Sequence, residues 1–255
     1  DPGMIFLTMG SWALWNLGYP DQALNHTHQA LELTEKRQHT YSRAFAVSVN
    51  ANTLYNCGDW DACEKLSDEA MTLSTEHGFP FWLSWGTIMK GAVQIQRGRV
   101  AEGITLIEQE VQRFERAGIG MGRPTHLAFL AAAHNQLGHH EQALKLLDEG
   151  FAIVENRQGD VNEAELHRLK GLVLLSIDPG NQAEAEACFR KAMEVAVRQD
   201  AMSLQLRAAM SLAELHRQQG KADEARSELS AVFDWFTEGF DTADLIAARK
   251  LLSQL

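Results

Sequence analysis

Residues 11–23, Ser-Trp-Ala-Leu-Trp-Asn-Leu-Gly-Tyr-Pro-Asp-Gln-Ala, contain a spacing that recurs along the whole chain. The glycine at position 18 has five later equivalents; four of the five intervals between these glycines are 40 residues, and the fifth is 42. Internal periods of this length are the signature of repeat architectures, so the repeat is taken as the unit of the fold. The glycines are Gly18, Gly58, Gly98, Gly138, Gly180 and Gly220.

Small residues occupy two columns of this repeat. The column five positions after the glycine holds Ala23, Cys63, Gly103, Ala143, Ala185 and Ala225, and the column seven positions before it holds Ser11, Ala51, Gly91, Ala131 and Ala213, with Gly171 in the 42-residue repeat. Small side chains are needed where two helices approach closely, because the ridges of one helix fill the grooves of the other. We therefore expect a helical hairpin in each repeat. The glycine ends its first helix (helix A) in the left-handed conformation, and the second helix (helix B) begins two or three residues later.

The spacing predicts an all-α fold, a right-handed α-solenoid of about six hairpins of about 40 residues each plus a C-terminal capping helix over 241–254. We expect one domain over 1–255, with units of about 1–38, 39–78, 79–122, 123–158, 159–200 and 201–239. All five prolines fall at predicted starts or turns, where they do not disturb a helix interior. The expected A helices span 4–17, 40–57, 80–97, 124–137, 161–177 and 202–219, and the B helices 20–36, 60–76, 100–117, 140–156, 181–199 and 222–238.

The composition and charge of the chain argue against several classes of function. The net charge of −11 and the scatter of the 23 basic residues argue against direct nucleic-acid binding, which needs clustered Lys and Arg. Three cysteines without a framework spacing indicate free thiols in a reducing compartment, and no apolar run is long enough to cross a membrane. We expect a cytoplasmic protein, and because the chain starts at Asp1 and not at Met, a fragment of a longer one.

The columns resemble the tetratricopeptide repeat (TPR) consensus, although the unit here is longer than the usual 34 residues. Four phrases in order, Trp12–Leu24, Gly78–Gly86, Glu163–Gly171 and Trp235–Leu245, resemble the C-terminal region of bacterial multidomain signalling ATPases. In those proteins an adenylate/guanylate-cyclase-type or DNA-binding domain precedes a STAND-type ATPase and a TPR tail. The resemblance implies a sensor or regulatory tail. The phosphate loop of such an ATPase is missing from this sequence, whose one Gly-Lys pair, Gly220-Lys221, lies at a helix turn.

Motifs that suggest catalysis or cofactors have simpler explanations. The stretch Gly118–Gly122 resembles a nucleotide-binding loop, but it lies between two predicted helices and is interpreted as a connection. His134, His139 and His140 straddle a turn without a nearby cysteine, whereas zinc needs three or four converging ligands. No nucleophile and base have supporting context. We therefore predict no catalytic residues, no metal and no cofactor.

Helix A lines the concave face of a TPR superhelix, and its exposed positions are therefore the candidate binding residues. Trp, Tyr and Arg are the usual anchors of recognition surfaces, and Asn can hydrogen-bond a peptide backbone. Ser48 stands one turn before Asn52 where a lysine would be needed, which argues against a carboxylate clamp of the chaperone-binding kind. The alternative for each aromatic residue is packing between repeats. The candidates are Trp12, Trp15, Asn52, Tyr55, Trp85, Asn135, Glu165, Arg168, Arg207, Glu214 and Arg217.

Three non-catalytic functions stay open at this point. In the first, the groove holds a protein or peptide segment, including an upstream ATPase domain of the same parent chain whose activity it restrains. A small-molecule sensor would use an aromatic-rich pocket lined by Trp12, Trp15 and Trp85. Self-association, as in a homodimer, would use the terminal helix and the segment Trp235–Phe240. An enzyme would need converging titratable groups, which the sequence does not offer.

Overall fold

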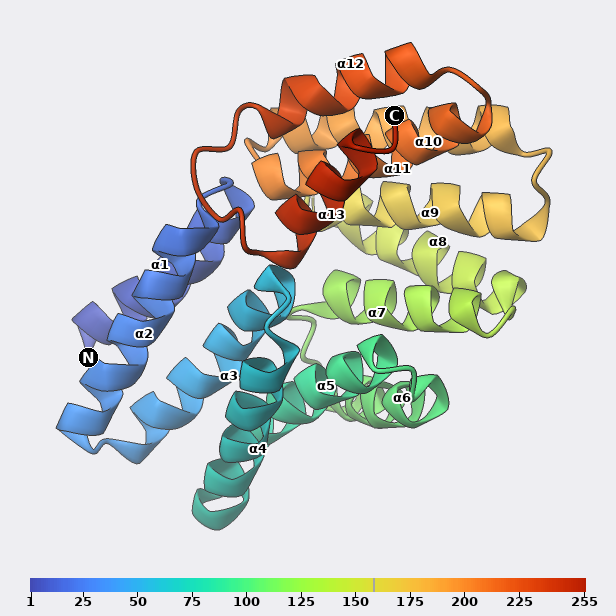
Figure 1. Cartoon of the computed structure of the whole chain (residues 1–255). Coiled ribbons are helices and arrows are strands. Elements are labelled where there is room, and N and C mark those ends of the chain that lie inside the picture. Colours follow the sequence, from blue (N-terminus) through green and yellow to red (C-terminus); the bar gives the residue numbers. More distant parts are fainter. Residues whose placement is uncertain (158) are drawn as a thin grey trace. The chain divides into compact units, whose positions relative to one another are not determined.

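The computed structural model describes residues 1–157 and 159–255, and within these residues it contains thirteen α-helices and no strand (Figure 1). The A helices are α1 (Pro2–Asn16), α3 (Thr40–Cys57), α5 (Pro80–Gln96), α7 (Arg123–Gln136), α9 (Glu163–Ile177) and α11 (Met202–Gln218), with α13 (Ala243–Leu252) at the end. The B helices are α2 (Pro20–Arg37), α4 (Trp60–His77), α6 (Val100–Arg116), α8 (His140–Asn156), α10 (Gln182–Arg198) and α12 (Ala222–Phe233). The predicted alternation of helices is confirmed.

The chain forms two compact units. Unit 1 comprises Asp1–Trp15 and Tyr19–Gly120, and unit 2 comprises Asn16–Gly18 and Met121–Leu255. In unit 1, α2 to α6 pack in sequence order, and α3 also contacts α5. In unit 2, α7 to α13 pack in sequence order, and each A helix also contacts the next A helix, from α7 through α9 and α11 to α13. Hairpins that stack in series are the α-solenoid arrangement that the repeat predicted.

The small-residue columns lie where the helices of a hairpin cross. In the column after the glycine, Ala23, Cys63, Ala143, Ala185 and Ala225 are all 0% exposed. The hairpin of α5 and α6 is closely packed, since a Cβ added at Gly103 would lie 2.5 Å from the backbone oxygen of Gly91. No larger side chain fits at this crossing without moving the two helices apart.

Five of the six repeat glycines adopt the left-handed conformation, with φ between +75° and +90° at Gly18, Gly58, Gly98, Gly138 and Gly220. Gly180 does not, and the expectation is wrong there. Helix α9 ends at Ile177, and the next residue, Asp178, has an extended backbone conformation. The Asp178 carboxylate accepts a hydrogen bond from the Gly180 amide at 2.7 Å. Asn181, at the N-cap position of α10, makes no side-chain capping bond and donates its side-chain amide to the Leu174 carbonyl at 3.1 Å. The two extra residues of this repeat thus form a different turn.

Two other segments test the predicted boundaries. Helix α12 ends at Phe233, five residues earlier than predicted, because Phe236 turns inward and is 5% exposed in a cluster with Leu229 and Leu245. The glycine-rich stretch between α6 and α7 is a connection, as interpreted, with positive φ at Gly118 and Gly122. The expected boundary between the fourth and fifth units, at residue 158, lies outside the described residues.

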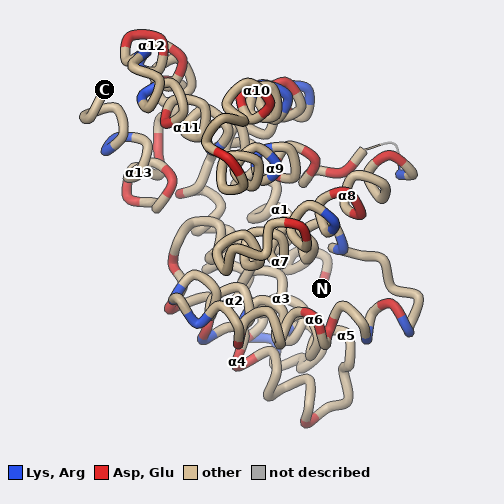
Figure 2. Tube along the Cα trace, turned by 90° about the vertical axis from the view of Figure 1, so that its right-hand side faces the viewer, with Lys and Arg blue, Asp and Glu red and all other residues tan. Residues whose placement is uncertain are grey.

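Charged residues, which Figure 2 marks along the chain, are scarce in the first four A helices. Helix α1 has no charged residue, and α3, α5 and α7 have one each, namely Arg43, Lys90 and Arg123. Arg43 and Arg123 each pair with a glutamate of the following B helix, whereas Lys90 Nζ pairs with an Asp68 carboxylate oxygen of the preceding B helix, α4, at 2.6 Å. In α9, α11 and α13, by contrast, the A helices carry charges of both signs.

Candidate functional site

A row of polar side chains connects the successive A helices of unit 2. On α7, the Asn135 amide donates to the Ser176 hydroxyl of α9 at 3.1 Å. The carbonyl oxygen of Asn135 lies 2.9 Å from Nδ1 of His140, at the start of α8. The repeat places residues of consecutive A helices about 40 positions apart side by side, so this contact is a direct product of the period.

The next step of the row joins α9 to α11. Arg168 donates from Nε and Nη2 to both carboxylate oxygens of Glu165, one turn earlier on α9, at 2.8 and 2.6 Å. The Nη1 atom of Arg168 lies 3.4 Å from the Ser211 hydroxyl of α11. The side chains of Glu165 and Arg168 are both 18% exposed, so they are half-buried and still reach solvent. A fork-to-fork pair of this kind fixes the orientation of the guanidinium.

The last step joins α11 to α13. Arg207 Nε donates to an Asp244 carboxylate oxygen at 2.8 Å, and these side chains are 19% and 23% exposed. Helix α13 therefore occupies the place of a seventh A helix, packed on α11 and α12. We refer to these seven residues as the A-helix strip: Asn135, Glu165, Arg168, Ser176, Arg207, Ser211 and Asp244.

The charges in the A-helix strip balance each other. Burial has the largest effect on the Glu165 carboxyl and raises its pKa, but Arg168, and more weakly Arg207, outweigh it, so that the pKa lies below the ordinary value. For Arg168, burial lowers the pKa and Glu165 more than restores it, leaving it raised. Glu165 and Arg168 thus stay ionised together. The strip offers oriented donors and acceptors to a ligand without an excess of either charge.

Other predicted candidates lie at the ends of A helices. Glu214 and Arg217 pair with each other at 2.7 and 2.9 Å near the end of α11, where Arg217 is exposed. In unit 1, the Tyr55 hydroxyl of α3 accepts from the Gln96 amide of α5 at 2.8 Å. The Asn52 carbonyl oxygen accepts from the Asn56 amide at 3.2 Å on the same helix.

The tryptophans of unit 1 are mostly packing residues, the alternative left open for them. Trp15 is 5% exposed, so its ring does not present the surface predicted for it, whereas Trp12 is half-buried. Trp85 is half-buried and its ring lies 5.9 Å from that of Phe81. Trp82, which sequence reasoning did not select, is 8% exposed and lies at the centre of an edge-to-face cluster between hairpins. Such contacts stabilise the stacking of repeats.

The segment Trp235–Phe240, predicted for self-association, contains both exposed and buried residues. Trp235 is 41% exposed, but the adjacent Phe236 is buried. Phe240 packs against Phe233 at 6.0 Å between ring centroids, and the Arg249 guanidinium of α13 lies 5.5 Å from its ring centre. Most of this segment therefore packs between α12 and α13 and stabilises their contact.

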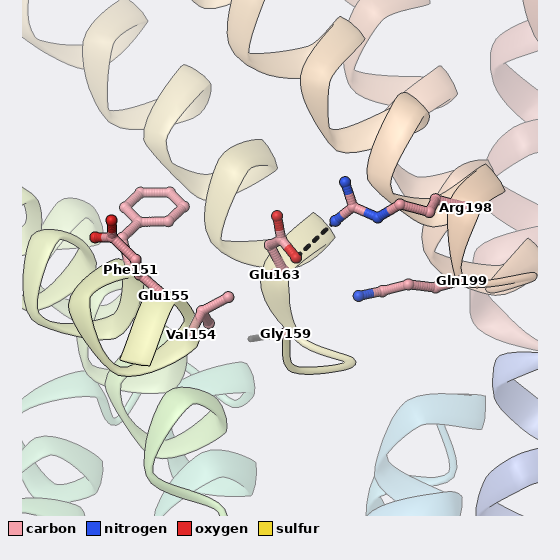
Figure 3. A pocket seen from close by; sticks show the side chains of 7 residues that line it. All are labelled: Phe151, Val154, Glu155, Gly159, Glu163, Arg198 and Gln199. Carbon is pink, nitrogen blue, oxygen red and sulfur yellow. Dashed lines mark hydrogen bonds and ion pairs between the residues drawn. The ribbon is translucent and has the colours of Figure 1, made fainter. Parts of the chain in front are cut away.

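A cavity of about 640 Å³ opens where the ends of α8 and α10 meet the start of α9 (Figure 3). Glu163 and Arg198 form an ion pair at 2.9 Å inside it. The Gln199 amide nitrogen is bonded to the Asp160 carbonyl, and its buried oxygen has no hydrogen-bond partner. No pattern in the sequence pointed to this cavity, because its lining comes from three helix ends that only the fold brings together. The lining residues are Phe151, Val154, Glu155, Gly159, Glu163, Arg198 and Gln199.

Sequence reasoning also missed Ser176, Ser211 and Asp244 of the A-helix strip. A usable signal was present for all three, since Ser176 follows Asn135 by 41 positions, Ser211 follows Arg168 by 43 and Asp244 follows Arg207 by 37. Each is thus close to one period after a selected residue. Pairing each candidate with the residue one repeat later would have found them.

Comparison with known proteins supports the repeat assignment. The tetratricopeptide repeat family model matches residues 124–149 and 206–231, which correspond to the hairpins of α7 with α8 and of α11 with α12. No curated protein sequence matches the chain.

Solved structures share the fold. The chain superposes on NprR, crystallised with its cognate peptide NprX, at a TM-score of 0.72 and 12% identity over 98% of this chain and 72% of NprR. It superposes on Bacillus thuringiensis PlcR, crystallised with the peptide PapR7 and DNA, at 0.69 and 13% over 84% of this chain and 75% of PlcR. The STAND ATPase PH0952 from Pyrococcus horikoshii, which has a tetratricopeptide repeat sensor, gives 0.52 and 15%, and the chain spans 38% of its length. At these identities the likeness concerns the fold.

No helix in the part of the chain that the structure describes is long and apolar enough to span a bilayer. Within the same residues, no group of three or more His, Cys, Asp or Glu side chains is arranged to hold a metal ion.

Proposed function

We propose that this chain is a non-catalytic interaction module that binds an extended protein or peptide segment along the A-helix strip of unit 2. The observation that carries the proposal is the continuous row of polar and charged side chains across α7, α9, α11 and α13, which are half-buried except for the exposed Ser176. Arg168 is held by Glu165 through two of its five N–H donors, so part of its guanidinium can still face a ligand. Donors and acceptors that are oriented in advance suit a peptide backbone, whose N–H and C=O groups alternate.

The structural neighbours support this choice of ligand class. NprR and PlcR were both crystallised with a peptide, and each shares the stacked-hairpin fold over most of its length. Stacked hairpins leave one face of every A helix uncovered by other helices, which makes an extended surface available to an extended guest. A peptide ligand for this chain follows from combining that surface with the polar strip.

A finer proposal concerns the parent protein. We infer that the module is the sensor or regulatory tail of a cytoplasmic signalling ATPase or cyclase, which it restrains by folding back on the ATPase domain. The four sequence phrases quoted above and the sensor role named for the repeats of PH0952 support this context. A ligand would then act by binding one of the two states more tightly. Titration of the chain with its separately expressed ATPase domain is the test, and no binding at high micromolar concentration would remove the fold-back version.

The peptide proposal can be tested with a random decapeptide display library as the probe. We expect enriched peptides to bind the chain in fluorescence polarisation, and Arg207→Gln to weaken them at least tenfold, since a lost charge-assisted hydrogen bond costs about 1.5–3 kcal/mol. Arg226→Gln on the outer helix α12 is the matched control, because Arg226 is exposed and lies on the opposite row. No enrichment, or peptides that bind both variants equally, would contradict the proposed site.

A small-molecule sensor is the second candidate, favoured by the cavity between α8, α9 and α10 and no longer by the N-terminal tryptophans. Its lining combines the Phe151 ring, the Glu163–Arg198 pair and the Gln199 amide, which suits a small ligand with an apolar body and a polar end. A thermal-shift screen with metabolites tests it. A stabilising compound that loses its effect in Phe151→Ala would support this candidate, and a screen without such a compound would remove it.

A further inference from the structure

The Asn135 side chain is held at both ends of its amide by residues from two other helices. Its nitrogen, Nδ2, lies 3.1 Å from the Ser176 hydroxyl of α9, and its oxygen, Oδ1, lies 2.9 Å from Nδ1 of His140. Asn135 lies in the last turn of α7, and His140 is the first residue of α8. Asn135 and His140 are half-buried and Ser176 is exposed, so this group of side chains borders solvent at one end of the A-helix strip.

The direction of each hydrogen bond follows from the Ser176 hydroxyl. This hydroxyl donates to the Leu172 carbonyl, one turn earlier on α9, at 2.9 Å. A hydroxyl has a single hydrogen, so Ser176 can only accept from Asn135, and the group that faces it must be the amide nitrogen. The Asn135 carbonyl oxygen then faces His140, and because an oxygen needs a donor, Nδ1 of His140 must carry a hydrogen. The contact between Ser176 and Leu172 thus determines the tautomer of His140.

We propose that His140 is a positioning residue of the ligand site, whose Nδ1–H fixes the orientation of the Asn135 amide. This inference rests on the proposed binding of an extended segment along the A-helix strip. A side-chain amide has two N–H donors and two acceptor lone pairs, and the contacts to Ser176 and His140 use one of each. One N–H and one lone pair of Asn135 stay available to a ligand. A residue of an extended backbone offers the complementary C=O and N–H groups.

The orientation of the Asn135 amide matters because the reversed amide presents the opposite pattern. With its two ends exchanged, a ligand meets an oxygen where it otherwise meets an N–H, and its own carbonyl is left unpaired. Substitutions of His140 separate the two cases. Asparagine can donate from its side-chain amide in place of the imidazole Nδ1–H, whereas aspartate only accepts and favours the exchanged orientation. His139→Asp is the matched control, because it adds the same charge at the adjacent exposed position, where the native ring faces His134.

Nitrogen NMR of isotope-labelled imidazole rings tests the tautomer in the whole chain without a ligand. The measurement is made at about pH 9, above the range in which histidine side chains ordinarily change charge. The signals of His140 are identified by their loss in His140→Asn. We expect Nδ1 of His140 to be the nitrogen that carries the hydrogen. A His140 ring with its hydrogen on Nε2 would overturn the inference, whether or not a peptide binds.

Fluorescence polarisation with the peptides enriched from the decapeptide library measures the effect on binding. We expect His140→Asn to keep the native Kd within about threefold. His140→Asp should weaken binding about tenfold or more, since a misdirected donor and a misdirected acceptor both lose their partners. His139→Asp should bind as the native chain does. Circular dichroism of each variant shows whether the helices are retained.

Two binding results would contradict the role of His140. Equal weakening by His139→Asp and His140→Asp would overturn it, because the added charge alone would then explain the loss. Peptides that Arg207→Gln weakens and His140→Asp does not would also overturn it, while leaving the proposed function in place.

Discussion

Replacing Gly103 by alanine tests whether the small-residue columns exist for close helix packing. An added Cβ at this position of α6 would lie 2.5 Å from the Gly91 carbonyl oxygen and 2.6 Å from the Ile95 side chain of α5. The obstacle on one side is backbone, which cannot rotate away. Reaching an ordinary contact of 3.4 Å requires the helices to separate by roughly 0.9 Å, that is 3.4 minus 2.5.

Two opposing effects set the size of the change. Alanine is favoured over glycine in a helix interior by about 1 kcal/mol, so propensity alone predicts stabilisation. Overpacking a tight core costs about 1–3 kcal/mol, and the backbone obstacle places this site at or above the upper end. A gap of 0.5–1 Å also forfeits about a quarter to a half of the dispersion energy of the contacts it opens. We expect a net loss of about 2 kcal/mol in the free energy of unfolding.

Thermal and urea unfolding followed by circular dichroism measure this loss. For a chain of this length about 2 kcal/mol corresponds to a fall in Tm of about 4–8 °C. Gly180→Ala is the matched control, because Gly180 lies in an exposed turn, lacks positive φ, and its added Cβ would approach only the Asp178 side chain. A Gly103→Ala chain as stable as the native one, or more stable, would refute the argument that the columns are required by the helix crossings.

Three further predictions follow from individual sites. Gly98→Ala, at φ +81° with no neighbour within 4 Å of an added Cβ, should cost about 1 kcal/mol in urea unfolding through backbone conformation alone, and an unchanged midpoint would contradict this. Burial, with a smaller effect of Arg123, lowers the pKa of His126 to about 3. The unfolded chain therefore takes up the proton first as pH falls below 6.5, stability is lost between pH 6.5 and about 3, and the ring should still be neutral in an NMR titration at pH 5. Burial also raises the pKa of the Cys63 thiol to about 12, so iodoacetamide at pH 8 should modify the half-buried Cys188 before Cys63, and all three cysteines only in urea. Equal rates for Cys63 and Cys188 in the folded chain would count against the buried position.

The helices were predictable because their determinants are local. Gly58 ends α3 in the left-handed conformation, and Pro80 begins α5, as the sequence indicated. The failures occurred where a distant contact decided the outcome. Helix α12 stops at Phe233 because Phe236 packs in a cluster with Leu245. No residue near position 234 indicates in the sequence that the helix ends there.

The candidate site was predictable only in part. The helical register named Asn135, Arg168 and Arg207 on A helices, and the structure gives all three a polar partner on the next A helix. Exposure could not be predicted in the same way. Trp15 and Arg207 were both expected on the surface, yet Trp15 is 5% exposed, because an aromatic ring gains more from burial between helices than an arginine does.

The sequence by itself determined the repeat, the order of the helices and the crossings at which only small residues fit, because these follow from backbone conformation and from volumes fixed by residue type. Tertiary structure alone decided which side chains face solvent and which meet across neighbouring hairpins. Those outcomes depend on the orientation of one hairpin on the next, which is set by many weak packing contacts summed over both surfaces. The A-helix strip of unit 2 is a product of that second level.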